Sequence, residues 1–325
     1  VDSSPLVIQG KYIYAACQGG IILKCDIQGS VLAHAQLHGW RIQADLVVIE
    51  EDKWIIACGY SLEGKGIVGA LSLDLGPWIW YHEVDFPVKK APIRVDDNLL
   101  LQAGRHILLL NLNNGKAQPV AHATLPHPSI AKPIVFKKKN QWSLLYASSE
   151  WESCLMVVNF DGKIQKVLEY EIGPVHKDPI KLKDDFAVIT DSYGALHKIE
   201  LSTLEIKSTR RLSSHPLSSP LVLTNGSSVV GSYDGSVRCV NDAGEVWDCL
   251  VGAAIYSTPV MLSAQLILIC TTAGDLVIVD ATLGVIRSRH RVSAEIWSKA
   301  LVVDDEVVFG ARDSCLHYYK CLVQL

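Results

Sequence analysis

The sequence predicts an all-β fold, an eight-bladed β-propeller of four-stranded antiparallel blades in which the last blade is incomplete. Three observations support this prediction. An apolar segment that usually begins with proline recurs every 39 to 47 residues, four short strand-like runs fill each interval, and no stretch shows a sustained helical apolar period. A repeat of this length is typical of propellers and solenoids, and the lack of a helical period favours strands.

The first strand of each blade is predicted from the recurring proline-led segment. Its full copies are SSPLV at 3–7, APIRV at 91–95, KPIVF at 132–136, DPIKL at 178–182, SPLVL at 219–223 and TPVML at 258–262. Two copies, ADLVV at 44–48 and KALVV at 299–303, lack the proline. Proline is tolerated here because the first residue of a strand need not donate to the neighbouring strand.

The other three strands of a blade follow in a fixed order, which is clearest between residues 218 and 251. The second run is SSVVGS, a Tyr-Asp-Gly turn comes next, the third run is SVRCVN, and a Gly-bearing hairpin leads to the fourth run, GEVWDCLV. A single four-stranded meander cannot bury both of its faces, whereas stacked meanders can. We therefore expect Trp247, in the fourth run, to pack between two blades.

The repeat divides the chain into blades of a single β-propeller domain covering 1–325. The predicted blades are approximately 3–43, 44–90, 91–130, 131–177, 178–218, 219–257, 258–298 and 299–325. The eighth interval ends after its third strand. Either this blade is left three-stranded or, as we expect, residues N-terminal to Val1 complete it in the natural protein.

Composition narrows the class of protein. The net charge of −4 gives no general basic surface for nucleic acid. The longest apolar runs, such as LILIC at 266–270, are too short to span a bilayer. The nine cysteines are odd in number and form no Cys-x-x-Cys pair, which favours reduced thiols in a cytoplasmic protein over a disulfide framework. We expect neither a nucleic-acid nor a membrane partner.

Two stretches carry a resemblance to known families. The segment SSPLVLTNGSSVVGSYDGSVRCVNDAGEVWDC resembles the PQQ-like, quinoprotein-type propeller repeat. More narrowly, the opening VDSSPLV and the ending VVFGARDSCLHYYKCL resemble the C-terminal propeller of the β-alanine-activating, aminoadipate-semialdehyde-dehydrogenase-like acyl-adenylating enzymes. The narrower resemblance implies that an adenylation domain and a phosphopantetheine carrier domain precede the propeller.

The sequence predicts no catalytic residue, no cofactor-binding residue and no metal ligand in this domain. Quinone-dependent dehydrogenases of this fold need calcium held by Glu, Asn and Asp, a tryptophan platform and an Asp base. Many of these dehydrogenases also have two adjacent cysteines. This sequence has neither a Cys-Cys pair nor a recurring carboxylate-amide cluster, so PQQ and calcium are not expected. The chain also lacks a phosphate loop, a Gly-x-Ser-x-Gly elbow and a His-Glu-x-x-His motif. His122 and His127 are expected to be exposed loop histidines.

Position in the fold predicts a binding site better than any motif. In propellers, the segments that lead into the first strands share one face with the turns between the second and third strands, and function concentrates on such loops. This candidate binding rim contains Arg41, Lys90, Arg105, Lys132, His176, Lys177, Tyr193, Tyr233, Trp297, Lys299 and Arg312. Its basic and aromatic residues suit an acidic or phosphorylated partner. Alternatively, Trp297 and the tyrosines pack between blades and the lysines are solvated.

These observations favour a non-catalytic interaction or substrate-presenting domain, the C-terminal part of a multidomain acyl-activating enzyme. The expected partner is a protein, a carrier domain, or the acyl group on a phosphopantetheine arm. One alternative is a free-standing propeller scaffold for protein–protein assembly. Another, less favoured by the residues present, is a quinone-dependent oxidoreductase.

Overall fold

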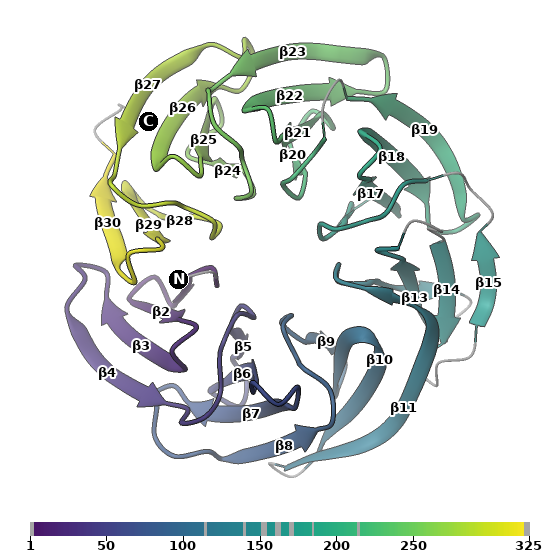
Figure 1. Cartoon of the computed structure of the whole chain (residues 1–325), viewed down its shortest axis with the longest axis vertical. Helices are drawn as coiled ribbons and strands as arrows, with labels where there is room; N and C mark the ends of the chain where they lie inside the picture. The colour runs from purple at the N-terminus through teal and green to yellow at the C-terminus, as the bar shows by residue number, and fades with distance from the viewer. Residues whose placement is uncertain are drawn as a thin grey trace. The chain divides into compact units, whose positions relative to one another are not determined.

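The structure is a computed structural model and describes residues 3–113, 116–138, 141–150, 155–159, 164–168, 172–183, 185–212 and 215–321. Every regular element in these ranges is a β-strand, and the strands form eight consecutive antiparallel sheets (Figure 1). Each sheet is a meander of sequence neighbours, and the last one has three strands. The predicted fold class, an eight-bladed β-propeller with an incomplete last blade, is confirmed.

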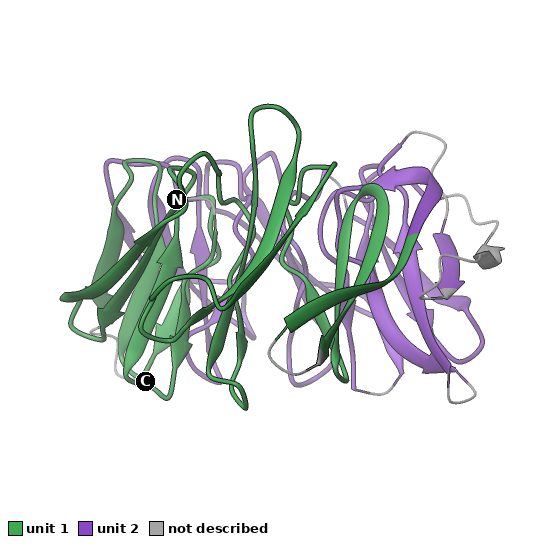
Figure 2. Cartoon of the chain, turned by 90° about the horizontal axis from the view of Figure 1, so that it is seen from below, with its two compact units in different colours: residues 1–122, 297–325 green, residues 123–296 purple. Residues whose placement is uncertain are grey.

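The chain forms two compact units, coloured separately in Figure 2. Unit 1 contains Val1–His122 and Trp297–Leu325, and unit 2 contains Ala123–Ile296. No helix in the part of the chain that the structure describes is long and apolar enough to cross a membrane.

Unit 1 begins with two four-stranded sheets. The first sheet contains β1 (Leu6–Ile8), β2 (Tyr12–Ala16), β3 (Ile21–Asp26) and β4 (Val31–Gln36), and the second contains β5 (Val47–Ile49), β6 (Trp54–Tyr60), β7 (Gly66–Ser72) and β8 (Trp80–Val84). Buried side chains of both sheets, among them Ile22, Ile55 and Leu71, form one apolar cluster. Stacking therefore buries the faces that a single meander would leave in water.

The last sheet also belongs to unit 1. It contains β28 (Leu301–Val303), β29 (Glu306–Gly310) and β30 (Leu316–Lys320). This sheet contacts the first sheet. The Tyr318 ring on β30 lies so close to Gly29, between β3 and β4, that a Cβ added at Gly29 would be 3.2 Å from the ring. In its third strand Leu316–Tyr319 are only half-buried, whereas the equivalent third strand of the sixth sheet is almost fully buried.

The third sheet has the order β11-β10-β9, with β9 (Ile93–Val95), β10 (Asn98–Asn113) and β11 (Lys116–Ser129). The long element β10 turns back on itself at Gly104, where φ is +59°, and Figure 1 draws it as an arch. The Asn111 side chain donates to Asn98 Oδ1 at 2.9 Å, which brings the two ends of β10 together. β10 therefore supplies both the second and the third strand of this blade.

The prediction that His122 and His127 lie in a loop is wrong, because both belong to β11. The prolines around them suggested a loop, but β11 is an edge strand of its sheet. Proline is tolerated in an edge strand because its missing backbone N–H can face away from the neighbouring strand. His122 lies 3.3 Å from the His106 ring, measured between ring nitrogens, and both rings stack on Phe86.

Unit 2 contains four complete sheets. The fourth sheet contains β12 (Ile134–Lys138), β13 (Gln141–Ala147), β14 (Leu155–Asn159) and β15 (Ile164–Leu168), and the fifth contains β16 (Ile180–Lys181), β17 (Phe186–Thr190), β18 (Ala195–Glu200) and β19 (Glu205–Arg211). The sixth contains β20 (Leu221–Val222), β21 (Ser228–Gly231), β22 (Ser236–Asn241) and β23 (Gly244–Leu250), and the seventh contains β24 (Val260–Met261), β25 (Leu266–Cys270), β26 (Asp275–Asp280) and β27 (Ile286–Arg291).

The serine two residues before the recurring proline has a structural role in several blades. Ser218 is fully buried, and its Oγ accepts the Gly231 N–H at 2.8 Å. Ser298 exchanges hydrogen bonds with both backbone groups of Gly310. Ser3 donates its hydroxyl to the carbonyl of Ala16. The serine thus ties the start of a blade's first strand to the end of its second, which explains why this residue recurs with the proline.

Trp247 confirms the prediction that it packs between blades. It lies on β23 of the sixth sheet, is 7% exposed, and donates its indole N–H to the carbonyl of Ala281, at the end of the seventh sheet's third strand, at 3.0 Å. The ring covers Gly284, where a Cβ would come within 2.7 Å of it. Trp247 therefore joins the sixth and seventh sheets by both packing and a hydrogen bond.

Candidate ligand-binding rim

The segment that leads into a first strand is here called the lead-in segment. In several of the described blades it is hydrogen-bonded to the turn between the second and third strands of the same blade. The Ser192 N–H donates to Pro174 O at 2.9 Å in the fifth blade, and the Tyr233 N–H donates to His215 O at 3.0 Å in the sixth. Arg41 and Tyr60 exchange two such bonds in the second blade. Backbone hydrogen bonds thus hold the rim loops in place without help from side chains.

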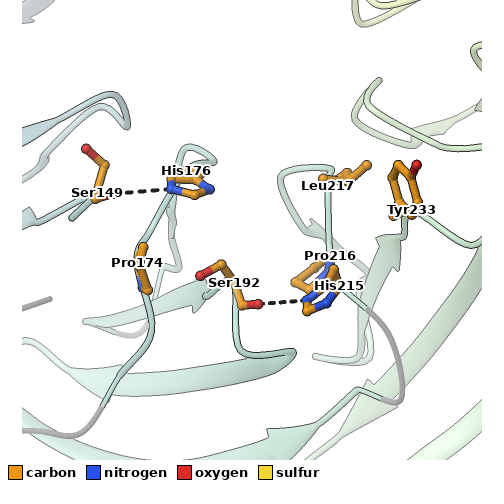
Figure 3. A pocket seen from close by; sticks show the side chains of 8 residues that line it. All are labelled: Ser149, Pro174, His176, Ser192, His215, Pro216, Leu217 and Tyr233. Carbon is orange, nitrogen blue, oxygen red and sulfur yellow. Dashed lines mark hydrogen bonds between the residues drawn. The ribbon is translucent and has the colours of Figure 1, made fainter. Parts of the chain in front are cut away.

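A pocket of about 430 Å³ opens at this rim in unit 2 (Figure 3). Its volume falls within the range of small-molecule sites, roughly 300–1,000 Å³. It lies among the turns and lead-in segments of the fourth, fifth and sixth blades. The lining residues are Ser149, Pro174, His176, Ser192, His215, Pro216, Leu217 and Tyr233.

Two histidines in the lining make the same contact in successive blades. His176 Nε2 lies 3.3 Å from Ser149 O, and His215 Nδ1 lies 2.8 Å from Ser192 O, the two bonds dashed in Figure 3. A carbonyl oxygen can only accept, so the bonded ring nitrogen must donate in each case. The opposite nitrogen of each neutral ring, Nδ1 of His176 and Nε2 of His215, therefore carries a lone pair for a ligand.

The Ser192 hydroxyl is the unusual polar group of this pocket. Its Oγ is buried and has no hydrogen-bond partner, although both backbone groups of Ser192 are bonded. Buried polar atoms in proteins nearly always have a partner, and an exception calls for a specific reason. This hydroxyl can both donate and accept, so a bound ligand could supply the missing partner.

The turn that carries Ser192 is held by its buried neighbour Asp191. Asp191 Oδ2 accepts from His197 Nε2 and from the Gly173 N–H, both at 2.8 Å, while Oδ1 accepts from the N–H groups of Tyr193 and Ala195. Burial of Asp191 raises its pKa, but the hydrogen bonds from His197, Gly173 and Ala195 outweigh it and lower the pKa overall. The ionised carboxylate thus organises the turn beside the pocket.

Among the predicted rim residues of unit 2, only His176 and Tyr233 line the pocket. Tyr233 is 65% exposed, and Tyr193, on the turn after Ser192, is 48% exposed. The Lys177 ammonium instead lies 5.0 Å from the centre of the Tyr256 ring. The backbone N–H of Lys132 donates to Asp178 Oδ1 at 2.9 Å.

The other predicted rim residues, Arg41, Lys90, Arg105, Trp297, Lys299 and Arg312, belong to unit 1. Arg312 stacks on Trp297, with its guanidinium carbon 3.8 Å from the ring centre. The Lys89 ammonium similarly lies 4.8 Å from the Tyr60 ring. These cation–π contacts pair aromatic residues of the rim with its cations. No Lys, Arg, Asp or Glu lines the described pocket of unit 2.

Sequence reasoning missed Ser149, Ser192, His215 and Leu217. One signal could have found His215, because it lies just ahead of a proline-led first strand, in HPLSSP, as the predicted His176 does in VHKDP. Nothing in the sequence marks Ser192, since its importance comes from its burial without a partner.

The described carboxylates of unit 2 can be compared with what a calcium ion would need. Calcium needs several oxygen ligands that converge on one point. The buried carboxylates use their oxygens elsewhere, Asp191 for His197 and backbone N–H groups and Asp275 for Arg291. Within the described ranges, no group of three or more His, Cys, Asp or Glu side chains is placed to hold a metal ion.

Comparisons with solved structures agree with the fold. The chain is similar to BamB from Moraxella catarrhalis, with a TM-score of 0.79, 15% identity, and coverage of 98% of this chain and 96% of that one. It is also similar to the computationally designed Ika8 protein, with a TM-score of 0.75, 15% identity, and coverage of 98% and 95%. At this identity the likeness concerns the fold alone. The chain has the fold of a β-propeller.

No protein-family model matches the chain. Among curated proteins, it is similar to the beta-alanine-activating enzyme of Danio rerio, with 25% identity over 130 residues. That match covers 38% of this chain and 11% of the enzyme's own length.

Proposed function

We propose that this chain is an interaction domain that docks a protein partner, in particular a carrier domain with its acyl group, at the rim of its blades. The observation that carries this proposal is the rim pocket of unit 2. It combines apolar walls with a few oriented polar groups, the arrangement typical of recognition sites. Exposed Tyr193 and Tyr233 beside it are of a residue type enriched where proteins bind one another.

We further propose that the chain is the C-terminal part of a multidomain acyl-activating enzyme. The partial similarity to the beta-alanine-activating enzyme supports this parent, and so does the resemblance of the chain's two ends to such propellers. In this proposal adenylation and thioester chemistry take place in other domains. The propeller acts in the cytoplasm and uses neither PQQ nor calcium.

The cationic rim residues have a supporting role in this proposal. The Arg312 guanidinium lies over the Trp297 ring, and the Lys177 ammonium lies over the Tyr256 ring. An acidic carrier domain would be attracted by such residues during approach, since charge complementarity mainly raises association rates. The contacts that hold the partner would then come from the pocket and the exposed tyrosines.

The docking proposal is tested by titrating the isotopically labelled chain with a purified carrier domain, loaded or unloaded, and recording amide spectra. We expect signals of Ser192, Leu217 and Tyr233 to shift and Tyr233→Ala to weaken the shifts. Tyr81→Ala is a matched control, because Tyr81 is 58% exposed and lies on the outer strand β8. Unchanged spectra at saturating carrier concentrations would contradict docking.

The parent enzyme is tested by sequencing the full-length transcript. We expect an adenylation domain and a carrier domain in frame ahead of the propeller. The alternative is a free-standing scaffold that consists of the propeller alone. A transcript that encodes only the propeller would select that alternative.

A further inference from the structure

We propose that the rim pocket of unit 2 binds an uncharged aliphatic chain that carries secondary amides. This inference rests on the proposed function, because it names the chemical group that is docked. It differs from the sequence-based expectation of an acidic or phosphorylated ligand, which followed from the basic residues of the rim.

The described lining residues of the pocket offer no charged partner to a charged group. None of its described lining residues is Lys, Arg, Asp or Glu. Burying an ionised group without a partner of opposite charge is costly, so an anion would stay at the rim. Pro174, Pro216 and Leu217 instead offer apolar surface to a hydrocarbon chain.

The polar groups of the pocket match a secondary amide. In their neutral forms His176 and His215 use one ring N–H on a backbone carbonyl and so present an acceptor to a ligand. In Figure 3 the second ring nitrogen of His176 points away from Ser149, toward the side where Leu217 and Tyr233 lie. An amide N–H can donate to such a nitrogen, and an amide oxygen can accept from the unpartnered Ser192 hydroxyl.

The repetition of the His contact also suits a linear ligand. His176 lies three residues ahead of Pro179 and His215 five residues ahead of Pro220, and each ring donates to a turn carbonyl of the preceding blade, with Ser192 on the turn between them. A chain lying across these blades would meet an acceptor, a hydroxyl and a second acceptor in succession. Two sources share this chemistry, the pantetheine arm of a carrier and an extended uncharged peptide.

The inference is tested by calorimetric titration of the full chain with two probes, free pantetheine and a tripeptide blocked at both ends, acetyl-Ala-Leu-Ala-amide. We expect at least one probe to bind. Pantothenate, which ends in a carboxylate, should bind at least tenfold more weakly than pantetheine. Binding by pantetheine alone identifies a carrier arm, and binding by the tripeptide alone identifies a peptide partner. If neither probe binds, or if pantothenate binds as well as pantetheine, the inference fails.

Ser192→Ala separates a ligand role from a structural role. The variant should lose about fivefold in affinity, the effect of one ordinary hydrogen bond. Its unfolding midpoint should not fall, because the removed hydroxyl has no partner in the protein. Ser288→Ala, on the exposed outer strand β27, is the matched control and should bind normally. Unchanged affinity in Ser192→Ala would overturn the inference.

The two proposals can fail separately. If a carrier domain binds but neither probe does, the docking function stands and this assignment of the pocket falls. If a probe binds but no carrier domain docks, the pocket chemistry stands and the proposed function falls.

Discussion

Gly284→Ala tests the packing of the sixth blade on the seventh. Gly284 lies in the turn between β26 and β27, and its φ of +68° is in the left-handed region. A side chain in that region costs about 1–2 kcal/mol. An added Cβ would also lie 2.7 Å from the Trp247 ring, and such overpacking typically costs about 1–3 kcal/mol more. We expect Gly284→Ala to lower the free energy of unfolding by about 2–5 kcal/mol in total.

Gly226→Ala is the matched control. Gly226 has a similar φ of +82°, but an added Cβ would meet no atom within 4 Å. This variant should lose only the backbone contribution of about 1–2 kcal/mol. The difference between the two variants, about 1–3 kcal/mol, measures the clash with Trp247.

Urea denaturation followed by far-ultraviolet circular dichroism gives the free energy of unfolding of each variant. When Gly284→Ala is made in a Trp247→Leu background, it should lower the free energy of unfolding by less than it does in the original chain, since the leucine side chain is shorter than that of tryptophan. The reasoning is refuted if Gly284→Ala destabilises the chain no more than Gly226→Ala does.

Two further predictions concern ionisable groups. Because the pKa of Asp191 is lowered in the folded state, its stabilising effect is present above the unfolded value near pH 4 and is lost as the pH falls through the lower folded value. Asp191→Asn should therefore lower the free energy of unfolding by about 3 kcal/mol at pH 7. The difference between the variant and the original chain should shrink below pH 4. A difference that stays constant from pH 3 to 7 in a series of denaturation experiments would contradict this prediction. Burial raises the pKa of Cys239 to about 11 and of Cys270 to about 12, whereas Cys315 is exposed. Because thiolates are the reactive form, iodoacetamide at pH 8 should label Cys315 first, and comparable labelling of all three by mass spectrometry would show the buried thiols to be accessible.

The architecture could be predicted from the sequence because the recurring residues form hydrogen bonds, strands and turns within a single blade. A buried serine before the proline, an alternating strand and a Gly-bearing turn recur in several blades, each for the same physical reason. Ser218, for example, bonds to Gly231 only 13 residues away. Trp247 was also predictable, since a large apolar side chain on an outer strand needs a neighbouring blade to cover it.

The site could be predicted only in part. Position on the rim identified His176 and Tyr233, because the repeat locates the turns. It did not identify Ser192, His215 or Leu217, and the basic residues that it named are not among the described lining residues of this pocket. His122 and His127 were misassigned because the tolerance of an edge strand for proline depends on which strand lies outermost.

The sequence by itself determined the number of blades, the order of strands within each and the residues available at the rim, since these follow from short-range patterns. Only the tertiary structure decided which of those residues share a pocket, how the rings of His176 and His215 are oriented, and that the Ser192 hydroxyl is buried without a partner. These features depend on contacts between residues of different blades, which no pattern within a single repeat encodes.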